Sequence, residues 1–243
     1  MSLPWQALIY APLHLHGKRC SPRGQLTKEL LNWQFRFDDD QRFLYHKQLP
    51  MNLEYFGKEL AWYVKGERDD VSIIEHASIW KDMLNSDGTL TSNYGYLLWG
   101  YETAPLKRCV AELKRDPFSR RAVAHINKPE HFREGINDIP CTMYLQFIVR
   151  DGDLHTSVHM RSQDAVFGLR NDLPFFWFVA DVMAEALQVD ATTLNLTVGS
   201  FHVYERHWEK LDNVVHTPEA WLVPQIDWSE EVQSVAIKLK TPA

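Results

Sequence analysis

DIPCTMYLQFIVRDGDLHTSVHMRSQD, residues 138–164, predicts a β-hairpin. Residues 142–150 and 154–160 are rich in aromatic and β-branched side chains, and Asp151-Gly152 between them is a strong two-residue turn signal. A two-residue turn fixes the register, which places Cys141 opposite Ser162 and beside Arg161. Because Pro140 cannot donate to a ladder, we expect the strand to begin at the cysteine.

A thiol and a guanidinium are thereby predicted to meet at the open end of one hairpin. A nearby cation lowers the pKa of a thiol and favours the nucleophilic thiolate, which makes Cys141 a candidate nucleophile. The alternative is a small buried cysteine beside a surface arginine, since free cysteine is usually inert packing.

The composition excludes several classes of protein. The chain has 243 residues, and a hydrophobic content of 45% can supply a sizeable core. Its formal charge of −6 argues against a non-specific nucleic-acid binder. Three cysteines without a CxxC, and eleven histidines without HExxH or similar spacing, predict neither a disulfide framework nor a metal site.

No sequence signal places the chain in a membrane or outside the cell. No apolar run approaches the roughly 20 residues needed to span a bilayer. The apolar patch at residues 7–13 has no preceding basic region, which argues against a signal peptide. We therefore expect a cytoplasmic protein with no membrane partner.

The remaining chain predicts helices and strands without a repeat or a linker. Strands are expected over residues 30–37, 122–126 and 193–204. Helices are expected over residues 52–65, 104–115 and 175–188, with a further amphipathic segment over 72–84. Residues 1–28 are a mixture rich in Pro, Gly and basic residues, and the end of the chain is a helix start followed by a looser tail. We predict one α+β domain covering residues 1–243.

Several residues are candidates for a functional site, and each could instead have an ordinary structural or surface role. Glu59 adjoins the apolar stripe of its helix, where a lone carboxylate is more often a rim residue than a catalyst. Aromatic residues around two glycines at 93–100 suit either a flat ligand or plain core. His202 and Tyr204, two apart on a strand, share one face. Three arginines suit an anion or solvated surface: Arg23, Arg120 and Arg121.

Taken together, these pieces resemble the thymidylate synthase superfamily from about residue 20 to about residue 210. Pro140-Cys141 resembles its nucleophile motif, and Arg161-Ser-Gln-Asp164 with Phe167-Gly168 resembles its R-S-x-D…G segment. Gly199-Ser-Phe-His-Val-Tyr204 is similar to its sugar-binding strand, and Ser119-Arg-Arg121 to its phosphate-binding pair. The segment that begins at Glu59 resembles the helix that carries its general acid/base glutamate. Ile79-Trp80 resembles its folate-side tryptophan, and Tyr94-Gly95 resembles its active-site Tyr-Gly.

The resemblance implies a thymidylate-synthase-like fold, a mixed β-sheet with packed helices. It also implies an obligate homodimer through the sheet, in which the arginine pair acts on the other subunit's site. Two departures stand out: Thr142 where synthases carry a histidine, and Asp172 where they carry an asparagine. Both features resemble the phage deoxycytidylate hydroxymethylases. Related nucleotide hydroxymethylases make modified-base or antibiotic precursors.

The resemblance also implies a role for each candidate residue. The Cys141 thiolate would add to C6 of a pyrimidine, and 5,10-methylenetetrahydrofolate would supply the one-carbon unit at C5. Glu59 would order water and shuttle protons, Tyr94 would lie near the path of the C5 proton, and Asp172 would contact the base. The 5′-phosphate would be bound by Arg23, Arg161 and Ser162, with Arg120 and Arg121 of the partner subunit. The sugar hydroxyl would be bound by His202 and Tyr204, and the folate by Trp80, Asp164 and Gly168. No metal is implied.

The substrate follows from the chemistry of Asp172. A carboxylate accepts from the N4 amine of cytosine, whereas opposite O4 of uracil an ionised carboxylate sets acceptor against acceptor. This favours dCMP, with a shared proton between Asp172 and N3. A protonated Asp172 could instead donate to uracil, so a dUMP hydroxymethylase is an alternative. A thymidylate synthase, a dCMP methylase and a nucleotide-binding homologue without catalysis also stay open.

Overall fold

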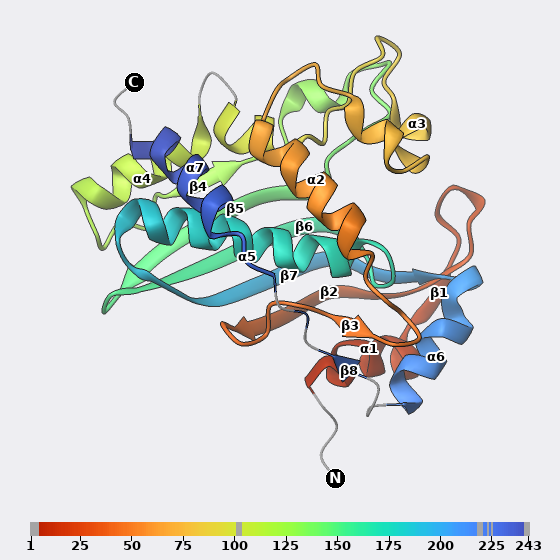
Figure 1. The fold of residues 1–243 in the computed structure, drawn as a ribbon. Coiled ribbons are helices and arrows are strands. Elements are labelled where there is room, and N and C mark those ends of the chain that lie inside the picture. The colour runs from red at the N-terminus through yellow and green to blue at the C-terminus, as the bar shows by residue number, and fades with distance from the viewer. Residues whose placement is uncertain (1–4, 101–103, 218–220, 223, 225, 241–243) are drawn as a thin grey trace.

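A six-stranded mixed sheet forms the centre of the protein (Figure 1). The computed structural model describes residues 5–100, 104–217, 221–222, 224 and 226–240. The strands run in the order β1-β2-β7-β6-β5-β4, and only β6 and β7 are parallel. Their bounds are β1 (Lys18–Cys20), β2 (Thr27–Asp38), β4 (Val123–His125), β5 (Thr142–Arg150), β6 (Asp153–Asp164) and β7 (Asp190–Tyr204).

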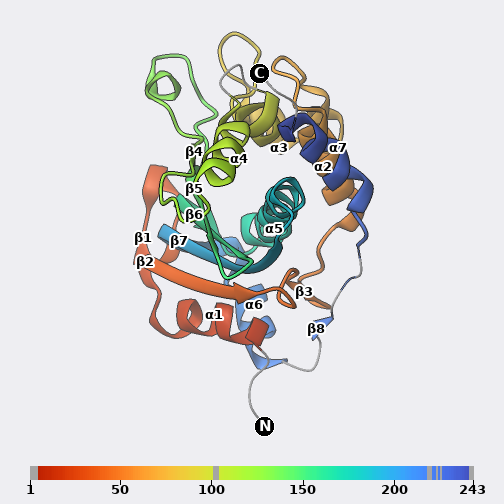
Figure 2. The same ribbon diagram turned by 90° about the vertical axis from the view of Figure 1, so that its left-hand side faces the viewer.

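Helices pack mainly on one face of this sheet. The parallel pair β6 and β7 is joined by α5 (Gly168–Leu187), which lies directly against the sheet (Figure 2). Beyond it lie α2 (Leu53–Lys65), α4 (Pro105–Arg115) and α7 (Ser229–Lys240). At the β2 side, α1 (Trp5–His16) packs on α6 (Trp208–His216). The smaller elements are α3 (Ile79–Met83) and the pair β3 (Tyr45–His46) and β8 (Trp221–Leu222). The predicted α+β class is confirmed.

The core lies between the sheet and α5. Alternate residues of β6, such as Val158 and Met160, are buried against the helix side, while Ser157 and His159 point to the opposite face. Residues 175–180 of α5 are all buried, as an apolar run without a polar stripe requires. In the described part of the chain, no helix covers the opposite face of β5, β6 and β7 (Figure 2).

The predicted hairpin forms, with one difference at its open end. Arg150 pairs with Asp153 across the turn, as expected, and the predicted register holds as far as Tyr144. A shift between Thr142 and Tyr144 then adds a residue to β5, as a β-bulge does. The predicted pairing of Cys141 with Ser162 is therefore wrong by one residue: the N–H of Arg161 donates to the carbonyl of Cys141 at 2.8 Å.

The bulge also moves the start of the strand. β5 begins at Thr142 rather than at Cys141, so the cysteine lies on a bend just outside the ladder. A bulge of this kind re-aims the neighbouring side chains, and bulges are common beside active sites.

Helix α2 confirms the predicted boundaries. The side chain of Asn52 accepts from the N–H of Tyr55, and Gly66 ends the helix in the left-handed conformation with φ 64°. The strands predicted around residues 30–37, 122–126 and 193–204 and the helix at 104–115 are also present.

Four helical segments differ from prediction. Helix α5 begins at Gly168, seven residues before the expected start, because Pro174 is accommodated within its second turn. This places Asp172 on a helix rather than in a connection. The segment at 72–84 is broken into a 3₁₀ turn (Ser72–Glu75) and the short α3. Helices α1 and α7 were not predicted, and α1 contains Pro12, which obscured its period.

The aromatic segment around Gly95 belongs to the core. A Cβ on Gly95 would lie 1.7 Å from the backbone oxygen of Tyr63 in α2, so only glycine permits this approach. Tyr94, Leu97 and Leu98 are buried around it. The two glycines therefore permit close packing of backbone segments rather than the approach of a ligand, while Tyr94 beside them lines a cavity.

Within the described part of the chain, every helix is too short or too polar to cross a bilayer.

Candidate active site

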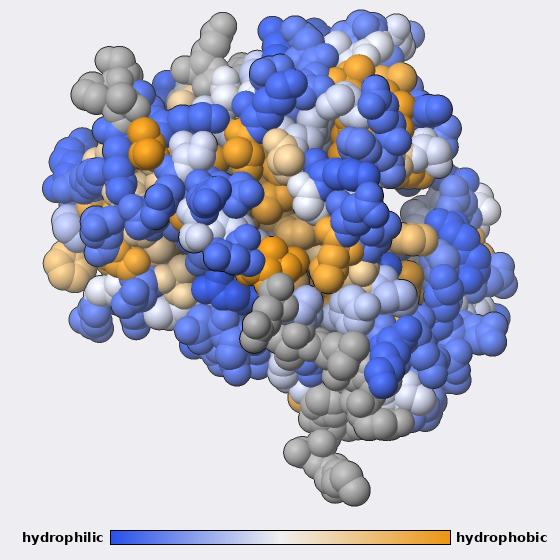
Figure 3. Space-filling view, in the orientation of Figure 1, coloured by the Kyte–Doolittle hydropathy of each residue, from blue (hydrophilic) through white to orange (hydrophobic). Residues whose placement is uncertain are grey.

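A cleft opens at one end of the sheet, where β5 begins and β6 ends. In the space-filling view the surface is hollowed between α3 and the segment after β1 (Figure 3). Its inner part has a volume of about 380 Å³, and it continues into an outer part of about 650 Å³ toward β1 and β7. The predicted site residues that line it are Arg23, Glu59, Trp80, Tyr94, Cys141, Arg161, Ser162, Asp164, Gly168, Asp172, His202 and Tyr204.

Cys141 faces this cleft next to the arginine that the hairpin predicted. Arg161 is oriented by the backbone of the cysteine loop, because its guanidinium donates to the carbonyls of Pro140 at 3.2 Å and Ile139 at 2.7 Å. Arg161 lowers the pKa of the thiol, as predicted, but the net shift in the free protein is upward. Burial raises the pKa of Cys141, and the charges of Arg161 and Arg23 offset this only in part.

Glu59 is buried in the cleft rather than exposed at the rim of its helix. Its side chain accepts a hydrogen bond of 2.7 Å from the hydroxyl of Tyr55, one helical turn earlier. The hydroxyl of Tyr55 accepts in turn from the indole N–H of Trp80 at 2.9 Å. Burial raises the pKa of Glu59 to about 8, the Tyr55 hydrogen bond opposes this rise, and the charge of Asp172 adds to it. The carboxyl is therefore a proton donor near neutral pH.

Asp172 is the second buried carboxyl. Burial raises its pKa to about 7, with a smaller opposing effect from a hydrogen bond of 2.9 Å that the Gln163 amide donates to Oδ2. Gly168 makes room for this pair, since a Cβ there would lie 3.2 Å from the amide nitrogen and 3.3 Å from Oδ2. The charge of Asp172 raises the pKa of both Cys141 and Glu59, which places the three groups within electrostatic reach of one another.

Tyr94 links the floor of the cleft to the core. Its ring stacks with Tyr63 and Phe175, with centroids 5.7 Å away in each case. Its hydroxyl accepts from the N–H of Thr142, with 3.4 Å between the heavy atoms, and so lies beside the nucleophile loop. The hydroxyl of Thr142 itself is buried without a hydrogen-bond partner among the described residues.

The outer part of the cleft is polar and cationic. Arg23 lies in the turn after β1 with φ 53°, and Arg161 projects from β6. His202 and Tyr204 lie on the same strand with ring centroids 5.2 Å apart, and Ser162 Oγ is 3.5 Å from Nδ1 of His202. Two guanidiniums near hydroxyl and imidazole groups suit a phosphate joined to a sugar.

Arg120 and Arg121 lie apart from this cleft. Both are exposed in the segment between α4 and β4, and neither lines the cavity of its own chain. The backbone holds this segment at the edge of the sheet, where the amide of Gln146 donates to the carbonyl of Arg120 at 3.0 Å. Neither arginine therefore contributes to the cleft of its own chain.

The mouth of the inner cleft is apolar. Ile79 and Phe167 are exposed to 61% and 52%, and they lie at the cleft with Trp80. Asp164 lies behind Phe167, and its Oδ1 accepts from the N–H groups of Val166 at 2.7 Å and Phe167 at 3.2 Å. An exposed apolar rim with a carboxylate and an indole suits a flat heterocycle such as a pterin.

Tyr55 and Gln163 are contributors to the site that sequence reasoning missed. The spacing of Tyr55 four residues before Glu59 puts both on one helix face, which was a readable signal. No comparable signal existed for Gln163. It is the variable position of R-S-x-D, and its contact with Asp172 depends on where α5 begins.

The site defines a class of protein before a family. A thiol, two buried carboxyls of raised pKa and an anion subsite share one cleft, as in transferases that act on nucleotides. The thymidylate synthase family matches residues 11–240, and the chain belongs to that family. It is a one-carbon transferase, and the family implies a nucleotide substrate and methylenetetrahydrofolate.

Within this family, the chain is similar to phage enzymes that share one name. The chain is 34% identical to the deoxycytidylate 5-hydroxymethyltransferase of Enterobacteria phage T2 over 214 residues, which cover 82% of this chain and 85% of the relative. The proteins of the same name from phages T6 and T4 are also 34% identical, over 82% and 81% of this chain and 85% and 83% of theirs. The function is thus of the hydroxymethyltransferase and thymidylate synthase type.

Proposed function

We propose that this protein transfers a hydroxymethyl group to C5 of dCMP. Deoxycytidylate, 5,10-methylenetetrahydrofolate and water would give 5-hydroxymethyl-dCMP and tetrahydrofolate. The observation that carries the proposal is the buried, raised-pKa carboxyl of Asp172 in the same cleft as Cys141 and Glu59. The names of the phage relatives support it.

Asp172 recognises the base in this proposal. Because Oδ2 accepts from the Gln163 amide, a proton on the neutral carboxyl belongs on Oδ1. A neutral carboxyl held this way offers one donor and one acceptor. Cytosine is complementary to this carboxyl, because its N3 accepts a hydrogen bond and its N4 amine donates one. The pKa of about 7 keeps that proton available near neutral pH.

Cys141 activates the ring. Its sulfur adds to C6, and the electron pair of the C5–C6 bond is drawn toward N3, where the proton shared with Asp172 neutralises it. This makes C5 nucleophilic, so that it takes the one-carbon unit from the folate. Burial disfavours the free thiolate, and Arg161 and Arg23 oppose that effect.

Glu59 acts in the final step, with Thr142 next to the nucleophile in sequence. Loss of the C5 proton, with Tyr94 near its path, and of tetrahydrofolate leaves an exocyclic methylene at C5. A hydroxymethylase adds water to this methylene where a synthase adds hydride, and the Cys141 sulfur then leaves C6 as the ring is restored. Glu59 orders that water, with its own position fixed by the chain of hydrogen bonds from Trp80 through Tyr55. Thr142, where synthases carry a histidine, follows the nucleophile directly, and its hydroxyl is buried without a hydrogen-bond partner among the described residues.

We further propose a homodimer through the uncovered face of β5, β6 and β7. Tyr144 and His159 stack on this face with ring centroids 4.3 Å apart, and a partner sheet would bury them. Pairing in this way would bring Arg120 and Arg121 of each chain to the phosphate end of the other cleft. Their exposure and their distance from their own cleft support this arrangement.

Substrate choice is tested by comparing kcat/KM for dCMP and dUMP in the wild type and Asp172→Asn. An asparagine can donate to O4 and accept from the N3 proton of uracil, so the substitution should move the preference toward dUMP by about 10- to 100-fold. Gln163 is left unchanged so that the same group orients both side chains. A wild type that already prefers dUMP would contradict the assignment and favour a dUMP hydroxymethylase.

A further inference from the structure

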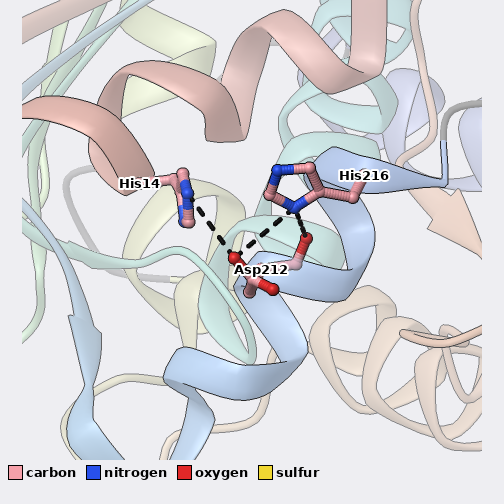
Figure 4. A group of neighbouring side chains, drawn as sticks. All are labelled: His14, Asp212 and His216. Carbon is pink, nitrogen blue, oxygen red and sulfur yellow. Dashed lines mark hydrogen bonds and ion pairs between the residues drawn. The ribbon is translucent and has the colours of Figure 1, made fainter.

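A cluster of two histidines and one aspartate lies on the surface away from the active-site cleft. His14 comes from the last turn of α1, and Asp212 and His216 are four residues apart on α6 (Figure 4). One ligand atom from each residue can be chosen so that all three lie within 4.8 Å of one another. Residues so far apart in the chain are joined only because α1 packs on α6.

The distances in this cluster fit a small transition-metal ion. His14 Nε2 and His216 Nδ1 lie 3.5 Å and 3.4 Å from the same carboxylate oxygen of Asp212. Ligands about 2.0–2.1 Å from a tetrahedral zinc ion are roughly 3.3–3.4 Å from each other. The separations are longer than ordinary hydrogen bonds and close to those of coordinated atoms.

The ligands are positioned by rigid neighbours. Leu13 of α1 and Leu211 of α6, each next in sequence to a ligand, are fully or almost fully buried, which fixes the two helices at this contact. In this structure Nδ1 of His216 donates to the carbonyl oxygen of Asp212 at 2.8 Å, and Nδ1 gives up this hydrogen bond when it binds an ion. The rings of His14 and His216 meet edge to face with centroids 5.5 Å apart, as Figure 4 shows. The two helices can stay in place when an ion binds, while the His216 ring turns away from the Asp212 carbonyl.

We propose that His14, Asp212 and His216 form a binding site for a divalent transition-metal ion of the zinc class. Two imidazoles and one carboxylate suit zinc, and they leave a fourth position for water. When Nδ1 of His216 ligates, its ring proton moves to Nε2, and that side chain is largely exposed.

The site has a structural consequence because it joins two segments that lead to the cleft. Helix α1 continues through β1 to the turn that carries Arg23, and α6 follows the strand that ends at Tyr204. A metal ion would tie the helices at the ends of these segments. An ion that binds only the folded chain raises the melting temperature by mass action.

Zinc alone is the probe, in titration calorimetry and thermal denaturation of the full chain. The wild type should bind one ion per chain at this site, and a hundredfold excess over the dissociation constant should raise Tm by about 5–10 °C. His14→Ala and His216→Ala should each weaken binding at least about tenfold and remove the rise in Tm. His16→Ala is the matched control, an exposed histidine of the same helix outside the cluster, and it should behave as the wild type does.

Two results would overturn the proposal. One is a wild type whose Tm does not respond to zinc, and the other is zinc binding that is equally strong in the His14 and His216 variants, which would place the ion elsewhere, for instance on a cleft cysteine. Should either alanine variant fold poorly, His14→Gln and Asp212→Asn preserve size and polarity. They should still lose at least about tenfold in zinc affinity.

Discussion

The buried Glu59 makes the stability of this protein depend on pH in a defined direction. Its pKa is raised to about 8 in the folded chain, mainly by burial, from an ordinary value of 4.5. Between these values the unfolded chain has lost a proton that the folded chain keeps. The free energy of unfolding therefore falls as pH rises, by about 1.4 kcal/mol per pH unit. The contribution is fully present below pH 4.5 and is lost as pH rises through 8.

Glu59→Gln removes this titration. From pH 5.5 to 7.5 the free energy of unfolding of the wild type should fall by about 2–3 kcal/mol relative to the variant. Urea denaturation at fixed protein concentration and ionic strength measures the difference at each pH. Glu54→Gln is the matched control on the same helix. Its carboxyl is exposed beside Lys58, which lowers its pKa, so this variant should run parallel to the wild type. Parallel curves for Glu59→Gln would refute the reasoning and mean that Glu59 is ionised in the free protein.

Three further predictions concern the nucleophile, the assembly and the packing. Cys141→Ala should abolish turnover while leaving nucleotide binding by calorimetry largely intact, and appreciable product would rule out the covalent route. Mixing that variant with inactive Arg121→Ala subunits should restore part of the activity, because one hybrid site regains both groups; no recovery after verified exchange would argue against sharing between chains. Gly95→Ala should destabilise the fold by about 3 kcal/mol or more, since its Cβ would meet the Tyr63 backbone, whereas Gly57→Ala, with open space around it, should stabilise it by about 0.5–1 kcal/mol in urea denaturation. Equal effects of the two glycine substitutions would contradict the close-approach argument.

Local patterns sufficed for much of the fold. The alternation around Asp151-Gly152 and the capping residues of α2 act over a few residues, so sequence reasoning recovered the hairpin and that helix. Features that depend on tertiary context were missed. The shift near Thr142 has no local signature, and it moves Cys141 by one position. Pro174 predicted a helix start after it, so seven helical residues of α5 were missed. The helix tolerates this proline because burial of its apolar residues offsets the cost of the proline.

In the active site, too, local sequence predicted some features and tertiary context determined the others. Spaced motifs located the residues of the cleft, whereas their electrostatics depended on burial that a sequence does not display. The arginine beside Cys141 was predicted to lower the pKa of the thiol, but burial outweighs it. The cluster of His14, Asp212 and His216 was invisible to ligand-spacing rules, because one ligand is contributed by a helix at the other end of the chain.

The identity of the product tests the central proposal most directly. The wild-type protein is incubated with dCMP and 5,10-methylenetetrahydrofolate in water labelled with heavy oxygen, and the nucleotide and folate are analysed by mass spectrometry. We expect 5-hydroxymethyl-dCMP that carries one labelled oxygen, with an equal amount of tetrahydrofolate. A 5-methyl nucleotide without label, formed together with an equal amount of dihydrofolate, would contradict the account.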